Sequence, residues 1–147
     1  MFRAERQATV IWTGDLPHGK GELSGRSGAF QNLPVTWAAR IERSDGKTSP
    51  EELLAAAHAS CYSMALSLTL ANAGKEPQQL EVSTTYVFEE VNSAPRITTA
   101  RLDVRGKVAG ASEQEFADLA RQAEQLCPVS NAVRNNVAIS LNATLVQ

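Results

Sequence analysis

Apolar and polar residues alternate in several segments of the chain, and this pattern predicts half-buried β-strands. Two such segments in the first third, Gln7–Thr13 and Lys20–Ser24, are separated by the turn-like sequence GDLPHGK. A third segment, Val35–Glu42, has the clearest alternation. Its apolar face is expected to carry Val35, Trp37, Ala39 and Ile41. The first third of the chain is therefore expected to form strands.

Three further strands are expected in the second half of the chain. The alternating apolar positions of the first are Leu80, Val82, Tyr86 and Phe88, and those of the second are Ala100, Leu102 and Val104. The sequence NSAP at 92–95 is typical of a turn between them. The last strand is expected near Val137–Leu145.

A long helix is expected over Pro50–Ala73. Ser49 is a candidate N-cap and Glu52 stands three positions later, which is the capping-box pattern. Proline is favoured at the first helical position, and Gly74 supplies a stop signal. The helix is apolar or small on every side, which predicts that it lies buried in the core of a soluble protein.

A second helix is expected to begin at Ser112, where Glu115 completes another capping box. Its apolar stripe comprises Phe116, Leu119, Ala120, Ala123 and Leu126. The order of strands, helix, strands, helix and strand predicts one α+β domain over residues 1–147. The long helix would lie against a mainly antiparallel sheet.

Composition and charge exclude several classes of function. The 147 residues are 43% hydrophobic and carry a net charge of -2, with no basic cluster suited to nucleic acid. The N-terminal sequence lacks the apolar stretch of a signal peptide, so we expect a cytoplasmic protein. Residues 53–73 are uncharged, but polar side chains within them and the absence of a flanking Lys or Arg at their start argue against a membrane span.

The two cysteines are the candidate reactive groups. Cys61 lies inside the long helix, where a small buried apolar role is the simpler interpretation. Cys127 directly precedes Pro128, and as the N-cap of a short helix it would lie where the helix dipole favours a thiolate. Together the two thiols could form a reversible redox pair.

A thiolate in an apolar helix needs a positive partner, because burial disfavours the charged form. Arg40 is the candidate, on the strand face opposite Trp37, and Glu51 is the acid that would orient it. Each also has an ordinary interpretation, as a solvent-facing arginine and as a first-turn acid. Ten residues of helix separate Glu51 from Cys61 by about 15 Å, so a two-fold dimer of antiparallel helices would bring Glu51 to the partner's cysteine.

His58 stands three residues before Cys61 on a neighbouring part of the same helical face. It could be a base for a cysteine nucleophile or a metal ligand. A zinc site needs about four ligands, and the chain offers two cysteines and two histidines, with His18 in a remote loop. A buried, hydrogen-bonded histidine is the favoured interpretation.

The runs SPEELLAAAHASCYSMALS and CPVSNAV, with WTGDLPHGKG and PVTWAAR before them, resemble the osmotically inducible protein C and organic hydroperoxide resistance family. The resemblance covers nearly the whole chain and is greater to the osmotically inducible branch. It implies a thiol peroxidase that works as an intertwined homodimer. Cys61 matches the peroxidatic cysteine, Cys127 the resolving cysteine, Glu51 the first acid of the family's Pro-Glu pair, and Arg40 the arginine before it.

The resemblance also implies the reaction partners. Organic hydroperoxides would be reduced to alcohols, and an apolar pocket would make them better substrates than hydrogen peroxide. An external dithiol such as a protein-bound lipoyl group would then reduce the Cys61–Cys127 disulfide. No metal, haem or nucleotide is needed, and the chain has no glycine-rich phosphate loop.

Two other classes of function remain open. One is a non-catalytic homodimer that binds a small apolar ligand between its long helices. The other is a hydrolase in which His58 activates a cysteine. The hydrolase would lose activity when His58 is replaced and would tolerate Cys127→Ser.

Overall fold

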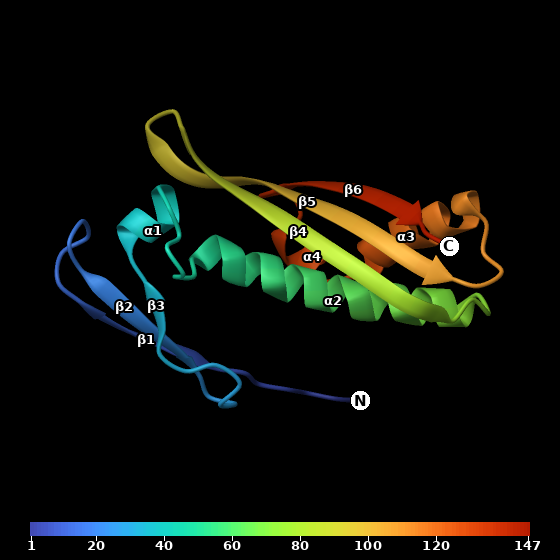
Figure 1. Ribbon diagram of the computed structural model, residues 1–147, viewed down its shortest axis with the longest axis horizontal. Helices are drawn as coiled ribbons and strands as arrows, with labels where there is room; N and C mark the ends of the chain where they lie inside the picture. Colours follow the sequence, from blue (N-terminus) through green and yellow to red (C-terminus); the bar gives the residue numbers. More distant parts are fainter. The chain divides into compact units, whose positions relative to one another are not determined.

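The computed structural model describes all 147 residues, which form two compact units, Met1–Pro50 and Glu51–Gln147 (Figure 1). That the two form one domain stays a prediction.

The first unit contains an antiparallel sheet with the strand order β1-β2-β3. Its strands are β1 (Ala8–Thr13), β2 (Lys20–Gly25) and β3 (Leu33–Val35), so the first two predicted strands are confirmed. Leu23 is the one buried hydrophobic residue of this unit. The sheet therefore has almost no core of its own.

The predicted strand over 35–42 is wrong beyond its first residue. β3 ends at Val35, and the next residues form the short helix α1 (Trp37–Ile41). Thr36 is extended, and its side-chain oxygen accepts a hydrogen bond from the Ala39 N–H at 3.1 Å. This N-cap starts a helix among good helix formers, and the local cap outweighs the two-residue alternation of the sequence.

The second unit contains the sheet β4-β5-β6 (Figure 1). β4 (Pro77–Val91) and β5 (Ala94–Val108) are antiparallel, and β6 (Ala138–Leu145) pairs with β5 in parallel. Asn92 and Ser93 both have positive φ, 51° and 61°, as a two-residue type I′ hairpin turn requires. The three predicted strands and the turn are confirmed, and the first two strands are longer than predicted.

The long helix α2 (Pro50–Asn72) begins where the sequence predicts and ends one residue earlier. Gly74 has φ +71°, and its N–H donates to the Ala71 carbonyl at 2.9 Å. The Lys75 N–H donates to the Leu70 carbonyl at 2.9 Å. These two bonds make a Schellman motif, in which glycine relieves the strain of the left-handed conformation.

The second predicted helix is α3 (Glu113–Leu126), and α4 (Pro128–Val133) follows it. The capping box of Ser112 and Glu115 is present as predicted. Leu126, expected in the apolar stripe, is 60% exposed, so that part of the prediction is wrong. At about 100° per residue, position 126 lies about 80° around the helix from the buried Phe116, whereas position 127 lies within about 20° of it.

The core of the second unit lies between α2, the sheet and α3, which confirms the predicted α+β packing of the long helix on a mainly antiparallel sheet. Its buried members are Tyr62, Leu66, Leu70, Leu102, Val104, Val108, Phe116, Ala120, Ala123 and Cys127.

Within this chain only one face of α2 is buried, so the predicted burial of the helix is confirmed for that face. Tyr62 and Leu66 lie in the core, whereas Met64 is 70% exposed and Leu68 is 63% exposed. α2 is also the one helix long and apolar enough to cross a membrane. Its polar Glu51 and His58 are buried with the core residues, as in the core helix of a soluble protein.

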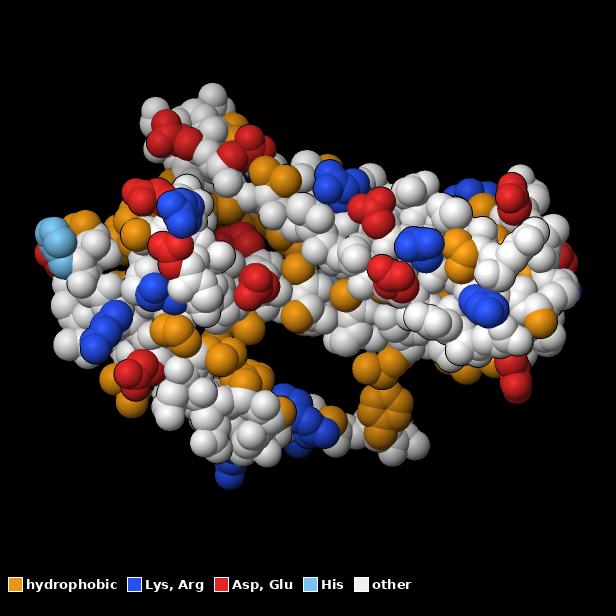
Figure 2. All heavy atoms as spheres, viewed as in Figure 1, with side chains coloured by type: hydrophobic (Ala, Val, Ile, Leu, Met, Phe, Trp, Pro, Cys, Tyr) orange, Lys and Arg blue, Asp and Glu red, His pale blue; other side chains and the backbone are white.

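Charges of both signs are interspersed on the face of the molecule in Figure 2, and no large cluster of one sign stands out there. This agrees with the even distribution of charge along the sequence.

Candidate active site

The structure brings the two cysteines together. Cys61 is partly buried on α2, and Cys127 is fully buried between α3 and α4. Both are free thiols, and Cys61 packs against the core cluster that contains Cys127, close enough for Cys127 to raise the pKa of Cys61. Residues 66 positions apart in sequence are thus in contact.

Cys127 is the N-cap of α4, as Pro128 predicts. Its sulfur accepts a hydrogen bond from the Ser130 N–H at 3.5 Å. Within this short helix, the cap directs a backbone donor at the Cys127 sulfur. Such a donor stabilises negative charge on sulfur as the thiolate forms.

Burial raises the pKa of the Cys61 thiol. The Val129 N–H hydrogen-bonds to Cys61 and lowers the pKa, whereas the hydrogen bond and charge interaction with Cys127 raise it. Within the second unit the thiol form of Cys61 is therefore favoured. A reactive thiolate at this position needs a positive charge close by.

His58 is fully buried and bonded at both ring nitrogens, which confirms the favoured interpretation. Nδ1 lies 2.9 Å from the Tyr86 hydroxyl, and Nε2 lies 2.7 Å from the Ser130 hydroxyl. Burial lowers the pKa of His58; Glu124 opposes this effect and Arg134 adds to it. Because both nitrogens face hydroxyl groups, His58 has no free nitrogen for Cys61, which argues against the hydrolase alternative.

Sequence reasoning missed the ion pair of Glu124 and Arg134. The Arg134 Nη2 lies 2.7 Å from Glu124 Oε1, and it also donates to the Glu124 carbonyl oxygen at 3.3 Å. Glu124 is only 6% exposed. The pair connects the last turn of α3 to the end of α4 across Cys127. The one signal in the sequence that could have indicated this ion pair is the charge of Glu124 within the apolar face of α3.

Glu51 is buried in the first turn of α2. The helix is continuous from Glu51 to Cys61, so the expected separation of about 15 Å along the axis holds. That Glu51 orients Arg40 stays a prediction.

Arg40 lies on α1 rather than on a strand. Its guanidinium carbon is 6.0 Å from the centre of the Trp37 ring, a cation–π distance. The predicted placement opposite Trp37 is therefore wrong, because residues three apart share one side of a helix. The pairing of Arg40 with Cys61 stays a prediction.

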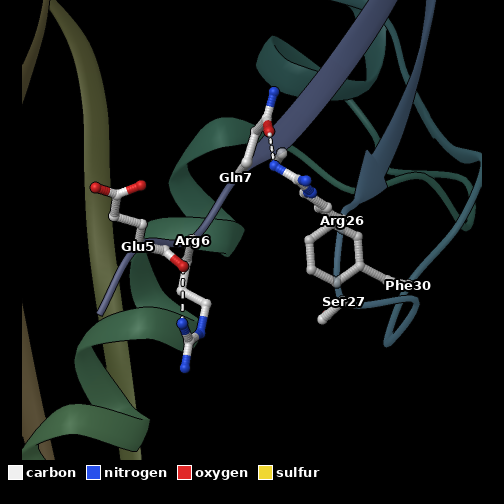
Figure 3. Close-up of a pocket in the computed structure, with 8 residues that line it drawn as sticks. Glu5, Arg6, Gln7, Arg26, Ser27 and Phe30 are labelled. Atoms are coloured by element: carbon white, nitrogen blue, oxygen red, sulfur yellow. Dashed lines mark hydrogen bonds between the residues drawn. The ribbon is translucent and has the colours of Figure 1, made fainter. Parts of the chain in front are cut away.

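No group of three or more His, Cys, Asp or Glu side chains is arranged to hold a metal ion. A hollow of about 980 Å³ lies in the first unit (Figure 3). In it, Arg26 donates to the Gln7 side chain at 3.2 Å, and Arg6 donates to the Glu5 carbonyl at 2.7 Å. It contains no cysteine, and both its arginines are engaged locally.

The family model described as OsmC-like protein matches residues 43–142. The chain belongs to the OsmC-like protein family. The family resemblance found in the sequence is confirmed. Peroxiredoxin OsmC of Escherichia coli K12 is 35% identical to this OsmC-like protein over 134 residues, which are 91% of this chain and 93% of the relative.

Organic hydroperoxide resistance protein-like 1 of Staphylococcus epidermidis is 34% identical over 110 residues, covering 72% of this chain and 76% of the relative. Of these two matches, the one to peroxiredoxin OsmC covers more of the chain, as the resemblance predicted.

Solved structures confirm the fold of this OsmC-like protein. An organic hydroperoxide resistance protein from Elizabethkingia anophelis has a TM-score of 0.79 at 23% identity, with 99% of both chains covered. OhrB of Bacillus subtilis has a TM-score of 0.75 at 21% identity, covering 94% of this chain and 98% of its own. At these identities the likeness shows the α+β fold alone.

Proposed function

We propose that this protein is a cysteine peroxidase that reduces organic hydroperoxides to alcohols. The observation that carries the proposal is the contact between two free thiols, Cys61 and Cys127, in a chain of the OsmC-like family. The relatives named peroxiredoxin and organic hydroperoxide resistance protein support the reaction class.

The chemistry needs only thiols. The Cys61 thiolate attacks the distal oxygen of the hydroperoxide, the O–O bond breaks, and the alkoxide takes a proton to leave as an alcohol. Cys61 becomes a sulfenic acid. Cys127 then attacks the Cys61 sulfur, the S–O bond breaks, water leaves, and a disulfide forms. An external dithiol, such as a lipoyl group on a protein, reduces it by exchange.

Arg40 supplies the positive charge that Cys61 needs, and Glu51 orients Arg40. The support for this part is electrostatic, because burial raises the pKa of Cys61 and a guanidinium would oppose that effect. Arg40 would also hydrogen-bond the peroxide and stabilise the leaving alkoxide. Glu51 cannot reach Cys61 along its own helix, so it acts on the site of a second chain.

The working form is a homodimer with one domain per chain, residues 1–147. Two observations support it. The outer face of α2 exposes Met64 and Leu68, and the first unit exposes Val10, Ile11 and Trp12 from a sheet with almost no core. Exposed apolar side chains grouped on one face are typical of interfaces. The small residues of α2 would let two copies of the helix approach closely.

Organic hydroperoxides are the favoured substrates over hydrogen peroxide, because the apolar surroundings of Cys61 suit a carbon tail. The location is the cytoplasm, where a disulfide that forms and breaks during catalysis is the usual kind. Equal catalytic efficiency with cumene hydroperoxide and hydrogen peroxide would contradict the substrate preference.

The deciding experiment is intact mass measurement after reduced protein meets a few equivalents of cumene hydroperoxide. Wild-type protein should lose two hydrogen atoms as the disulfide forms, and Cys127→Ser should gain oxygen at Cys61. Unchanged mass in both proteins would overturn the peroxidase proposal and favour a ligand-binding dimer.

A further inference from the structure

His58 joins the helix that carries Cys61 to the turn that carries Cys127. It lies one helical turn before Cys61 on α2, and its Nε2 is 2.7 Å from the hydroxyl of Ser130, 72 residues away in sequence. Both His58 and Ser130 are fully buried. The peroxidase chemistry proposed above uses neither side chain, although they make one of the shortest buried polar contacts in the molecule.

Ser130 connects this contact to the resolving sulfur. Its backbone N–H donates to the Cys127 sulfur at 3.5 Å, while its hydroxyl contacts His58. The ion pair of Glu124 and Arg134 holds the C-terminal end of the same short helix to α3. α4 is thus held to α2 through Ser130 in its first turn and to α3 through Arg134 at its C-terminal end.

We infer that His58 is a positioning residue for the disulfide-forming step, which rests on the proposed peroxidase function. Through Ser130 it holds the Cys127 sulfur against Cys61, so that the attack on the sulfenic acid occurs along a short, directed path. Disulfide bonds tolerate only a narrow range of Cα and Cβ separations, so a small shift of α4 would slow this step.

His58 does not move a proton in this step. Both ring nitrogens face hydroxyl groups, those of Tyr86 and Ser130, rather than a sulfur. The atoms balance without it: a sulfur–sulfur bond forms, the sulfur–oxygen bond breaks, and the departing hydroxide takes the proton released by the Cys127 thiol. The charged groups that act on His58 are Glu124 and Arg134.

The test separates oxidation of Cys61 from closure of the disulfide. Reduced protein is mixed rapidly with cumene hydroperoxide, and samples are quenched with dimedone, which traps sulfenic acid, before mass analysis. In Ser130→Ala and His58→Phe, oxidation of Cys61 should keep its wild-type rate. Disulfide closure should slow about five- to tenfold, the scale set by loss of one buried hydrogen bond. The dimedone-trapped fraction should rise accordingly.

Two further variants distinguish positioning from general stability. His58→Gln keeps an N–H near the place of Nε2 and should restore most of the closure rate. Tyr86→Phe removes the hydroxyl from the other ring nitrogen and keeps the His58–Ser130 contact, so it should slow closure less than Ser130→Ala does, even if it lowers stability. Its matched partner is Ser130→Ala, which removes the hydroxyl on the α4 side.

Wild-type closure rates in Ser130→Ala, or an equal slowing in Tyr86→Phe, would overturn the inference. Ser130→Ala removes one oxygen atom and keeps the backbone N–H that faces Cys127, so the inference can be tested even if His58→Phe does not fold. Failure of the peroxidase proposal has a different signature, since Cys61 of the wild type would then gain neither oxygen nor a disulfide.

Discussion

Gly106 on β5 faces the core at a point that leaves no room for a side chain. A Cβ atom built there would lie 2.3 Å from Cζ of Phe116, which is fully buried. We therefore expect Gly106→Ala to lower the free energy of unfolding by about 1–3 kcal/mol through overpacking. Urea denaturation at fixed protein concentration measures the loss.

The matched control for this prediction shortens the facing ring. Phe116→Leu removes the atoms that clash, so Gly106→Ala should cost less in the Phe116→Leu background than in the wild type. Equal costs in both backgrounds would show that the clash with Phe116 is not the cause.

His58 makes stability depend on pH. Its pKa in the folded protein is lowered from 6.5, chiefly by burial. Between 6.5 and this lower pKa, the unfolded chain binds a proton that the folded chain does not, so the free energy of unfolding falls as pH falls. Urea denaturation at pH 7, 6 and 5 should show a steeper loss for wild type than for His58→Gln. Parallel curves for the two proteins would contradict this expectation.

At the scale of elements, the cap of α3 is the clearest local device. The Ser112 hydroxyl accepts from the Glu115 N–H at 3.2 Å, and the Glu115 carboxylate accepts from the Ser112 N–H at 2.9 Å. Ser112→Ala should lower the free energy of unfolding by about 1 kcal/mol. Ser112→Asp should keep most of the stability of the wild type, because aspartate is also a good N-cap. Thermal and urea denaturation of the three proteins check this, and an equal loss in both variants would exclude the cap as its source.

Elements with local start and stop signals could be predicted from the sequence. Pro50, Gly74 and the Ser112 capping box mark α2 and α3 because these residues act on the backbone beside them. The helix α1 was missed because its few residues also fit the alternation of a strand. Only the Thr36 cap distinguishes a helix from a strand here. Leu126 was wrongly placed in the buried stripe because an apolar side chain alone does not show how far around the helix the buried face extends.

Some residues of the site could likewise be predicted from the sequence, and others could not. Cys61 and Cys127 could be singled out because thiols are rare and Pro128 marks a helix start. The contacts of His58 with Ser130 and of Glu124 with Arg134 could not, because they depend on how α2, α3 and α4 pack. Reactive atoms are therefore visible in sequence, whereas the side chains that position them require the tertiary structure.

At the scale of the whole molecule, the proposed dimer makes a prediction about shared sites. If Glu51 of one chain serves Cys61 of the other, Glu51→Ala and Cys61→Ser should each be inactive as homodimers. In a mixed dimer, the Cys61 of the Glu51→Ala chain meets an intact Glu51 from its partner, so one of the two sites is complete. Equal amounts of the variants, denatured and refolded together, should recover about a quarter of wild-type activity, since about half the dimers are mixed.

The control for the mixing experiment is the pair Cys61→Ser and Cys127→Ser. The contact of these two thiols lies within one chain, so no mixed dimer contains a complete cysteine pair, and mixing should not restore disulfide formation. If Glu51 instead acted within its own chain, every site in the first mixture would lack either Glu51 or Cys61, and activity would stay at the level of the separate variants. Recovery in the first mixture alone would therefore place Glu51 and Cys61 of one site on different chains.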